Sequence, residues 1–184
     1  MTLAYLVQHG EKQRLPGDPG LTPRGRQQAT ETGQWLRGLE VCALYSSPLR
    51  RGQQTAGCIA SAIGLAVQLD DRLRERLNWD GSEPFDAFLA VWARTTRERS
   101  FVPRGGDSSQ QAGARLRAFL ADLPTAPGPV AAVTHGGITS DLLRDLLGDD
   151  ALPGHLLEAG IPPCAVTVID DLKPVTIAST AHLE

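Results

Sequence analysis

The sequence predicts an α/β fold: a single-domain, three-layer α/β/α sandwich built on a mainly parallel β-sheet. Two observations carry this prediction. Short apolar or β-branched runs recur along the chain, and segments with helical spacing lie between them. Strands that alternate with helices are typical of a parallel sheet covered by helices on both faces. A chain of 184 residues is long enough for one hydrophobic core, so residues 1–184 are expected to form one domain.

The expected strands are the short apolar runs themselves. The first is LAYLV and the fourth is PVAAVT, and both are bounded by polar residues or glycine. We expect strands at residues 3–7, 41–46, 64–69, 129–134, 165–170 and 174–179.

The expected helices fill the segments between these runs. Thr22 can cap the first helix, with Pro23 at its first position, and Gly38 can end it after residue 37. Further helices are expected at residues 49–63, 84–99, 108–123 and 139–147.

Composition excludes several classes of function. The net charge of −3 argues against a nucleic-acid partner. No apolar run approaches the roughly 20 residues of a membrane span, so no membrane partner is expected. The N-terminus lacks the features of a signal peptide. Three widely spaced cysteines without a CxxC motif indicate free thiols in a reducing compartment, and the protein is expected to be cytoplasmic.

Polar residues that follow three of the strands are expected to meet at one edge of the sheet. In open α/β sheets, ligands bind beyond the carboxyl ends of the strands. His9 follows the first strand, Arg51 opens the helix after the second strand, and His135 follows the fourth. Gly10 is expected where the backbone passes close to a ligand, and Glu11 can hold neighbouring donors in place.

Two histidines, an arginine and helix N-termini form a natural cage for a dianionic phosphate. A neutral imidazole can attack phosphorus, and a carboxylic acid is then needed to protonate the leaving oxygen. Glu75, just after the third strand, is placed for that role. A structural role for a lone histidine is the common alternative. A metal site at His9 and His135 is not expected, because no HxH, HExxH or cysteine partner accompanies them.

The same residues resemble the motifs of the histidine phosphatase superfamily, which is also called phosphoglycerate mutase-like. That family opens with a strand followed by Arg-His-Gly-Glu, and this chain has Gln8-His9-Gly10-Glu11. The other motifs follow in family order, and the resemblance spans residues 3 to about 140. They are matched by residues 21–29, 46–56, 73–75, 105–108 and 133–137.

The resemblance implies a role for each matched residue. His9 is the nucleophile that becomes phosphorylated, and Arg51 is the arginine of the phosphate pocket. His135 donates to the phosphoryl oxygens, next to Gly136 at the helix N-terminus, and Glu75 protonates the leaving group. No metal or organic cofactor is implied, because the phosphohistidine forms on the protein itself.

Gln8 is the main departure from the family pattern, because it replaces one of the two pocket arginines. Glutamine keeps a donor at the phosphate but loses a charge-assisted hydrogen bond. A charged hydrogen bond is stronger than a neutral one by an amount on the order of 1–2 kcal/mol, so the replacement is expected to weaken catalysis by about 5- to 30-fold. Arg14, Arg50 or Arg104 could fill the gap.

Three functions remain open: a phosphatase, a phosphoglycerate mutase-type enzyme, and a weakly active or inactive binder of phosphorylated ligands. The short lid, roughly residues 76–104, favours a phosphatase, because a mutase must exclude water. The apolar positions 85, 88, 89 and 92 have helical spacing and are expected to pack inward. The partner is expected to be a small phosphorylated substrate or a phosphoprotein, and the protein a monomer or homodimer.

Overall fold

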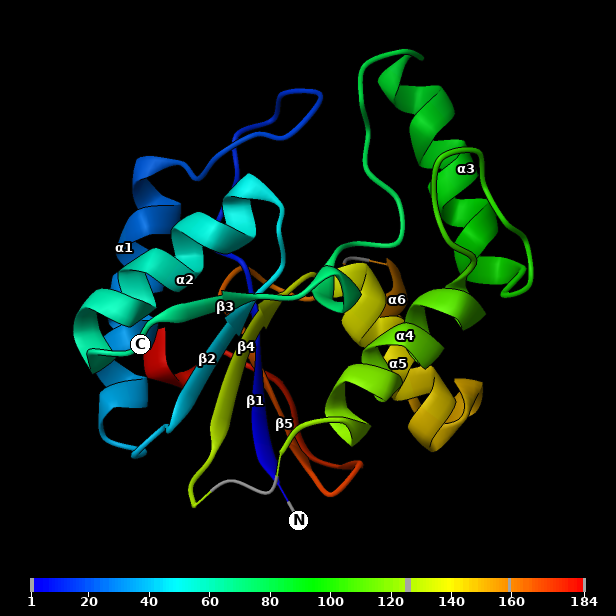
Figure 1. The fold of residues 1–184 in the computed structure, drawn as a ribbon. Coiled ribbons are helices and arrows are strands. Elements are labelled where there is room, and N and C mark those ends of the chain that lie inside the picture. Colours follow the sequence, from blue (N-terminus) through cyan, green and yellow to red (C-terminus); the bar gives the residue numbers. More distant parts are fainter. Residues whose placement is uncertain (1, 125–126, 159, 184) are drawn as a thin grey trace.

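The computed structural model describes residues 2–124, 127–158 and 160–183. Its strands form one sheet in the order β3-β2-β4-β1-β5-β6 (Figure 1). Strands β3, β2, β4 and β1 are parallel, and β5 and β6 are antiparallel to their neighbours, so the sheet is mainly parallel as predicted. The strands are β1 (Leu3–Gln8), β2 (Ala43–Ser46), β3 (Val67–Leu69), β4 (Val130–Thr134), β5 (Val166–Asp170) and β6 (Lys173–Ser179).

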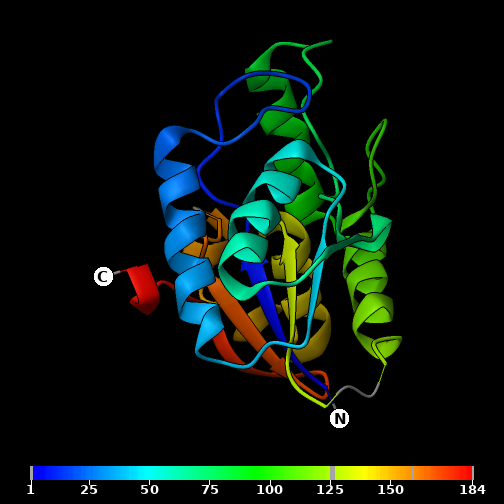
Figure 2. The same cartoon turned by 60° about the vertical axis from the view of Figure 1, so that its left-hand side comes forward.

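Helices cover both faces of the sheet and complete the three predicted layers. Helices α1 and α2 pack on one face, and α4 and α5 pack on the other (Figures 1 and 2). Within the described ranges, no helix combines the length and apolar character needed to cross a membrane. The α-helices are α1 (Pro23–Arg37), α2 (Arg50–Ile63), α3 (Phe85–Arg97), α4 (Ser109–Ala121), α5 (Gly136–Leu147) and α6 (Gly154–Glu158), and short 3-10 turns cover Asp71–Leu73, Asp149–Ala151 and Ala181–Leu183.

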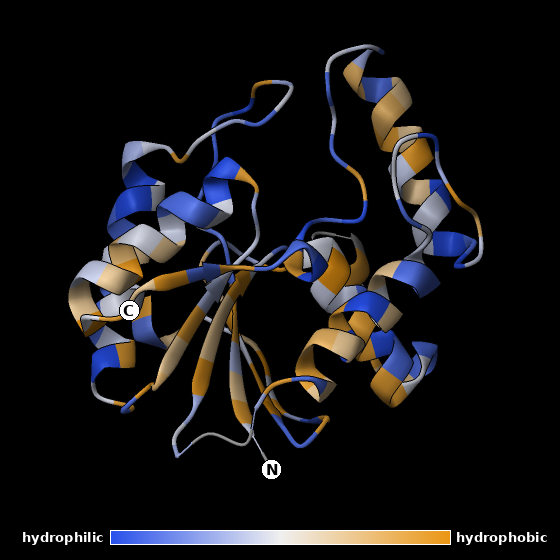
Figure 3. Cartoon of the chain, in the orientation of Figure 1, coloured by the Kyte–Doolittle hydropathy of each residue, from blue (hydrophilic) through white to orange (hydrophobic). Residues whose placement is uncertain are grey.

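The central strand β1 shows how the layers are held together. Successive side chains of a strand point to opposite faces, so Tyr5 and Val7 join the core under α1 and α2. Ala4 and Leu6 join the core under α4 and α5. These side chains are at least 90% buried, and Figure 3 shows the strands as predominantly apolar. Two apolar cores therefore fix β1 from both sides, so the residue that follows it is held rigidly.

The first helix begins as the sequence predicts, whereas α5 begins earlier. The Thr22 side chain accepts the N–H of Gly25 at 3.0 Å and caps α1. Helix α5 was expected from Thr139 but starts at Gly136. Two glycines are poor helix formers on their own. The carboxylate of Glu75, distant in sequence, accepts the N–H groups at this end and stabilises the extra turn.

The prediction that α3 packs an apolar face into the core is wrong. On α3 only Thr95 is buried, and Phe85 and Leu89 are 49% and 44% exposed. The helix stands off the sheet above α4 and α5 (Figure 1). Phe88 and Trp92, on the same face, line a cavity instead of the core. Helical spacing reveals which residues share a face, but it does not say whether that face meets protein or solvent.

Candidate active site

Three neighbouring parallel strands deliver the candidate catalytic groups to one edge of the sheet. His9 follows β1, and its N–H donates to the Thr134 carbonyl at the end of β4 (3.1 Å). Ser47 follows β2, and its N–H donates to the Val133 carbonyl (2.9 Å). The rings of His9 and His135 lie with centroids 5.1 Å apart and planes inclined at 61°. The predicted convergence of the two histidines is confirmed.

The His9 ring is held with one nitrogen free. Its Nδ1 lies 2.7 Å from the carbonyl oxygen of Gly10, which can only accept, so Nδ1 carries the proton. The Nε2 atom is therefore unprotonated and carries a lone pair. Burial, followed by the charge of Arg51, lowers the pKa of His9 to about 3. The imidazole is neutral near pH 7, the form that a nucleophile requires.

Arg51 faces this free nitrogen from the first turn of α2. Its Nε donates to His9 Nε2 at 3.3 Å, and the residue is 3% exposed. One terminal nitrogen lies 3.8 Å from the carboxylate of Asp18 and makes no hydrogen bond within the described structure. A buried guanidinium with an unused donor beside a nucleophile is suited to binding an anion.

His135 is fully buried, and Ser47 orients it. Its Nε2 lies 2.7 Å from the Ser47 hydroxyl, which also accepts the N–H of Leu49 at 3.2 Å. The Nδ1 atom is buried without a partner in the described part of the chain. If the Ser47 hydroxyl donates to Nε2, then Nδ1 carries a proton that is free to donate to a ligand. Burial and the charge of Arg51 hold the pKa of His135 well below its usual value.

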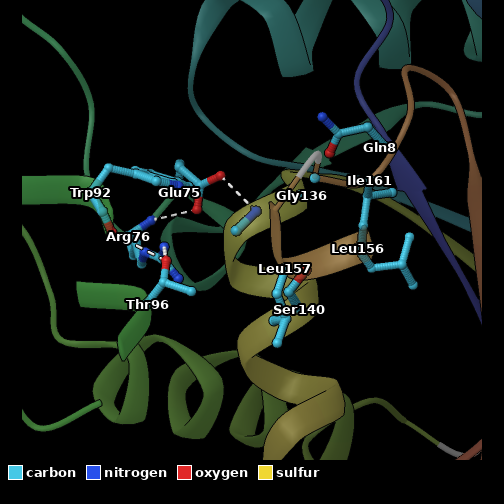
Figure 4. A pocket seen from close by; sticks show the side chains of 12 residues that line it. Gln8, Glu75, Arg76, Trp92, Thr96, Gly136, Ser140, Leu156, Leu157 and Ile161 are labelled. Carbon is cyan, nitrogen blue, oxygen red and sulfur yellow. Dashed lines mark hydrogen bonds between the residues drawn. The ribbon is translucent and has the colours of Figure 1, made fainter. Parts of the chain in front are cut away.

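Glu75 lies at the N-terminus of α5, where its carboxylate accepts three backbone N–H groups. The donors are Gly137 to Oε2 at 3.0 Å and Ile138 and Arg76 to Oε1 at 2.9 and 2.8 Å. Figure 4 shows Glu75 directed toward this helix end, with Trp92 beside it. These contacts fix the carboxyl group next to the cavity that contains His9.

Gln8 reaches the nucleophile but leaves part of its amide unpaired. Its Nε2 lies 3.4 Å from His9 Nε2, and its Oε1 is buried without a partner among the described residues. Gly136 lies beside it (Figure 4). Glutamine therefore retains a neutral donor at the position where the motif has an arginine.

Two cavities contain His9, and a third lies behind Glu75. The inner cavity, about 240 Å³, brings His9, Arg51 and Glu75 together with Lys12. The mouth, about 870 Å³, adds Arg14 to His9 and Lys12. The back cavity, about 250 Å³, lies between Glu75 and the loop after α6 (Figure 4). Of the predicted site residues, His9, Arg51 and Glu75 line the inner cavity, and Gln8 and Gly136 line the back cavity with Glu75. His135 lies behind them and lines none of the three.

A model of the histidine phosphatase superfamily (branch 1) matches residues 4–172. The chain belongs to this superfamily. The probable phosphoglycerate mutase GpmB of Enterobacter sp. is 34% identical over 97% of this chain and 89% of its own length. The protein of that name from Salmonella paratyphi A is 32% identical over the same shares.

Solved structures share the fold over the whole chain, and one of them is a phosphatase. The mycobacterial glucosyl-3-phosphoglycerate phosphatase in complex with inorganic phosphate superimposes with a TM-score of 0.78 and 27% identity, covering 100% of both chains. YhfR of Bacillus stearothermophilus gives a TM-score of 0.77 and 25% identity, also over 100% of both chains. The relatives of this superfamily member are thus named as phosphatases and as mutases.

Sequence reasoning missed several residues that support the site of this superfamily member. Ser47 and Thr55 lie inside a recognised motif, yet their roles appear only in three dimensions. The Thr55 hydroxyl accepts the N–H of Gly10 at 3.0 Å and donates to the Arg51 carbonyl at 2.8 Å. Lys12 lines both cavities that contain His9, as noted above. Its place directly after the first motif was the signal that could have identified it.

The explanation expected for Gly10 needs correction. A Cβ on Gly10 would lie 2.4 Å from the Gly25 carbonyl oxygen, so the close approach that requires glycine here is the one to α1. Glu11 holds neighbouring donors as predicted, because its carboxylate accepts the Thr22 hydroxyl at 2.7 Å. The glycine therefore locks the loop after β1 onto the start of α1.

The arginines expected to compensate for Gln8 lie in different places. Arg14 lines the mouth. Arg50 and Arg104 line neither of the two cavities that contain His9. The backbone N–H of Arg50 donates instead to the Asp18 carboxylate at 2.9 Å.

Proposed function

We propose that the protein is a phosphomonoester hydrolase that works through a phosphohistidine on His9. One observation carries the proposal. The unprotonated Nε2 of a neutral, buried His9 accepts from the guanidinium of Arg51, and the ring of the second histidine, His135, lies 5.1 Å from the His9 ring, centroid to centroid. An electron pair on nitrogen next to unused donors is what attack on a phosphate dianion requires.

In the first step, His9 Nε2 forms a bond to phosphorus as the bond from phosphorus to the ester oxygen breaks. Nδ1–H remains hydrogen-bonded to the Gly10 carbonyl, which stabilises the positive charge that develops on the ring. Arg51 and the Nδ1–H of His135 stabilise the equatorial oxygens. Glu75, which lines the same cavity, gives its proton to the departing alkoxide.

In the second step, water attacks phosphorus and the bond to His9 Nε2 breaks. Glu75, now a carboxylate, accepts the proton that water loses. The products are inorganic phosphate, neutral His9 and a reprotonated Glu75, so the cycle closes without a further reactant. The same carboxyl group acts as acid and then as base, as expected for consecutive steps of opposite direction.

Hydrolysis is favoured over mutase-type transfer by the form of the lid. A mutase must keep water from the phosphohistidine until a second hydroxyl takes the phosphoryl group. Here α3 stands clear of the sheet, and Phe85 remains 49% exposed at the mouth. The solved phosphatase at 27% identity, which covers the entire chain, also supports hydrolysis.

The experiment measures phosphate release from an aryl phosphate and from a panel of metabolite monoesters near pH 6. The expected result is turnover that His9→Ala abolishes. Rapid quenching should also trap phosphate on wild-type protein as an acid-labile adduct, and His9→Ala should form none. Turnover equal to that of His9→Ala on every ester would overturn the proposal and leave a phospholigand binder, with Gln8 as the mark of lost activity.

Mutase-type transfer is the second candidate, because the relatives at 32–34% identity carry the name phosphoglycerate mutase. The two activities differ in their products. Incubation with 3-phosphoglycerate yields glycerate and phosphate from a phosphatase, but 2-phosphoglycerate from a mutase. If 2-phosphoglycerate forms faster than inorganic phosphate, the protein is a mutase.

A further inference from the structure

The inner cavity has an apolar wall that the two chemical steps do not use. The wall consists of the rings of Trp79, Phe85, Phe88 and Trp92, which line the cavity together with Leu89. Consecutive ring centroids lie 5.0, 6.0 and 6.1 Å apart, so the rings form a continuous surface. We call these four side chains the ring wall. It continues directly from the cage of donors around the nucleophile.

Three large apolar side chains at this site are exposed. Leu15, Phe85 and Leu89 are 57%, 49% and 44% exposed, and each lines a cavity that contains His9. Single exposed leucines are ordinary, but a contiguous apolar surface inside a cleft with convergent polar groups is typical of a ligand site. The surface that Leu15 and α3 present is therefore suited to a carbon body bound next to the phosphate.

Both ends of the ring wall are held in place before any ligand binds. The guanidinium of Arg76 lies 4.1 Å from the centroid of Trp92, and the Trp79 indole N–H donates to the Glu83 carbonyl at 2.9 Å. Rings that are already oriented lose little freedom on binding, which favours affinity.

We infer that the substrate is a phosphomonoester of an apolar alcohol, either an aryl or a long-chain alkyl group, whose body lies along the ring wall. This inference rests on the proposed function. Glu75 and Trp92 line the same cavity as His9, so an ester oxygen placed at Glu75 directs its carbon chain toward Trp92 and Phe88. Cationic side chains, Lys12 and Arg51, gather at the phosphate end.

The test compares the binding of hexylphosphonate with that of ethylphosphonate. Neither compound can be hydrolysed, because each has a carbon–phosphorus bond in place of the ester. Binding is followed by tryptophan fluorescence, because Trp79 and Trp92 line the cavity. Each buried methylene strengthens binding by up to about fourfold, so hexylphosphonate is expected to bind at least about tenfold more tightly. The measurement does not require turnover, so this inference and the proposed function can fail separately.

The matched variants are Leu89→Ser and Leu147→Ser. Both leucines lie on helices and are similarly exposed, at 44% and 41%, but Leu147 lines none of the three cavities described above. Leu89→Ser should reduce the preference for the hexyl chain, and Leu147→Ser should retain it. Equal binding of the two phosphonates by wild-type protein would overturn the inference. An unchanged preference in Leu89→Ser, with loss of a dimer, would assign the surface to a second copy of the chain and overturn it too.

A different observation concerns the charge that Gln8 lacks. Lys12 follows the first motif and lines both cavities that contain His9. Within the described part of the chain, no carboxylate lies within ion-pair distance of its ammonium group. The pKa of Lys12 is lowered, first by displacement of water from around it and then by Arg51 and Arg14. The positive charges of Lys12, Arg51 and Arg14 thus lie close together at the phosphate end, where Asp18 lies within ion-pair distance of Arg51 and not of Lys12.

We propose, independently of the ring wall, that Lys12 supplies to the phosphoryl group the positive charge that Gln8 does not provide. This proposal also rests on the proposed function, but it is tested by binding of inorganic phosphate and needs no turnover. The test is a double-mutant cycle that compares wild-type protein with Lys12→Met, Gln8→Arg and the double variant. The affinity of each protein for inorganic phosphate is measured by calorimetry. Lys173→Met, which changes the chain's only other lysine, is the control.

Lys12→Met should weaken phosphate binding by about tenfold or more in the Gln8 background, as expected for the loss of a charged hydrogen bond. In the Gln8→Arg background the loss should shrink to less than about threefold, because the arginine takes over the same oxygens. An equal loss in both backgrounds would show that Lys12 does not replace the arginine. A Lys12→Met protein that binds phosphate as tightly as Lys173→Met would also overturn the proposal.

Discussion

The Oε2 atom of Glu75 accepts the backbone N–H of Gly137 at 3.0 Å, so the first turn of α5 holds the carboxyl group proposed to protonate the leaving oxygen. This contact requires glycine. A Cβ at position 137 would lie 2.6 Å from Glu75 Oε1 and 2.6 Å from a ring carbon of Trp92. Neither neighbour can remain in place beside a methyl group. The carboxyl group of the proposed proton donor and one end of the ring wall therefore both depend on the absence of a side chain at position 137.

Gly137→Ala should lower kcat by about 100-fold, because displacement of a catalytic group by roughly 1 Å can cost that much. Hydrolysis of an aryl phosphate, whose leaving group needs little protonation, should suffer less than hydrolysis of an alkyl phosphate. The measurement is kcat on both esters. Equal losses on the two esters would argue that the substitution disturbs the phosphate cage and not the proton donor.

Gly57→Ala is the matched control. Gly57 lies inside α2, and a Cβ there would meet nothing within 4 Å. Alanine in an exposed helix interior should raise the free energy of unfolding by roughly 0.5–1 kcal/mol. Urea denaturation of the two variants separates a general effect of alanine from the steric effect at Gly137. Activity of Gly57→Ala should match that of wild-type protein.

Stability should fall in mild acid because His9 is buried in its neutral form. The pKa of His9 is about 3 in the folded protein, against 6.5 for an ordinary histidine. Between these values the unfolded chain binds a proton that the folded protein excludes, so stability declines as pH falls from about 6.5. The slope approaches about 1.4 kcal/mol per pH unit for this one group.

His9→Gln removes this contribution, since glutamine does not titrate. Urea midpoints measured at pH 7.5, 6 and 5 should fall more steeply for wild-type protein than for His9→Gln. Parallel profiles for the two proteins would contradict a neutral, buried His9. His135 contributes in the same direction in both proteins, so it cancels in the comparison.

The buried ion pair between Arg76 and Asp141 should contribute strongly to the free energy of unfolding. One Arg76 terminal nitrogen lies 2.8 and 2.9 Å from the two carboxylate oxygens, and the other donates to Thr96 at 2.7 Å. Arg76→Met leaves a buried carboxylate without its partner and should cost about 3–5 kcal/mol in urea denaturation. The exposed pair of Arg94 and Glu98 is the control, and Arg94→Met should cost less than about 1 kcal/mol.

A second substitution tests the cause of that loss. In Arg76→Met/Asp141→Asn the buried charge is gone, so part of the lost stability should return. If the double variant is less stable than Arg76→Met alone, the loss comes from packing against Trp92 and not from the isolated carboxylate. Burial raises the pKa of Asp141 to about 6 although Arg76 opposes the shift, which is consistent with a strongly desolvated pair.

The parts of the fold and site that follow from local pattern were predictable. The apolar runs at residues 3–7 and 129–134 predicted strands, and the rule that ligands bind beyond the carboxyl ends of strands then placed His9 and His135 at one edge of the sheet. No pairwise contact had to be known for that step. The structure pairs these two strands directly. The positions of the strand ends therefore correctly predicted that the two histidines lie at the same edge of the sheet.

The parts that depend on contacts distant in sequence were not predictable. The start of α5 at Gly136 depends on Glu75, and the position of α3 depends on Arg76 beneath Trp92. The apolar face of α3 has the same periodicity whether it meets a core or a cavity. Ser47 is a similar case, because only the fold brings its hydroxyl to His135.

Ser47→Ala should reduce the rate of phosphoryl transfer more than it reduces phosphate affinity. The Ser47 hydroxyl lies 2.7 Å from His135 Nε2 and accepts the Leu49 N–H, and we expect it to donate its own proton to the ring. This arrangement keeps the proton of the neutral imidazole on Nδ1, where it can donate to a phosphoryl oxygen. Without the hydroxyl, the other tautomer becomes accessible and the Nδ1 donor is lost in part of the population.

We expect kcat to fall by about 10- to 100-fold, within the range seen when one donor to a developing oxyanion is removed or weakened. Phosphate affinity should change by less than about threefold, because Arg51 still carries the charge. Ser47→Thr, which retains the hydroxyl, should recover most of the rate. NMR of ring nitrogens labelled with ¹⁵N reports the tautomer of His135 directly. If wild-type His135 carries its proton on Nε2, Ser47 accepts from the ring, and His135 cannot donate to phosphate through Nδ1.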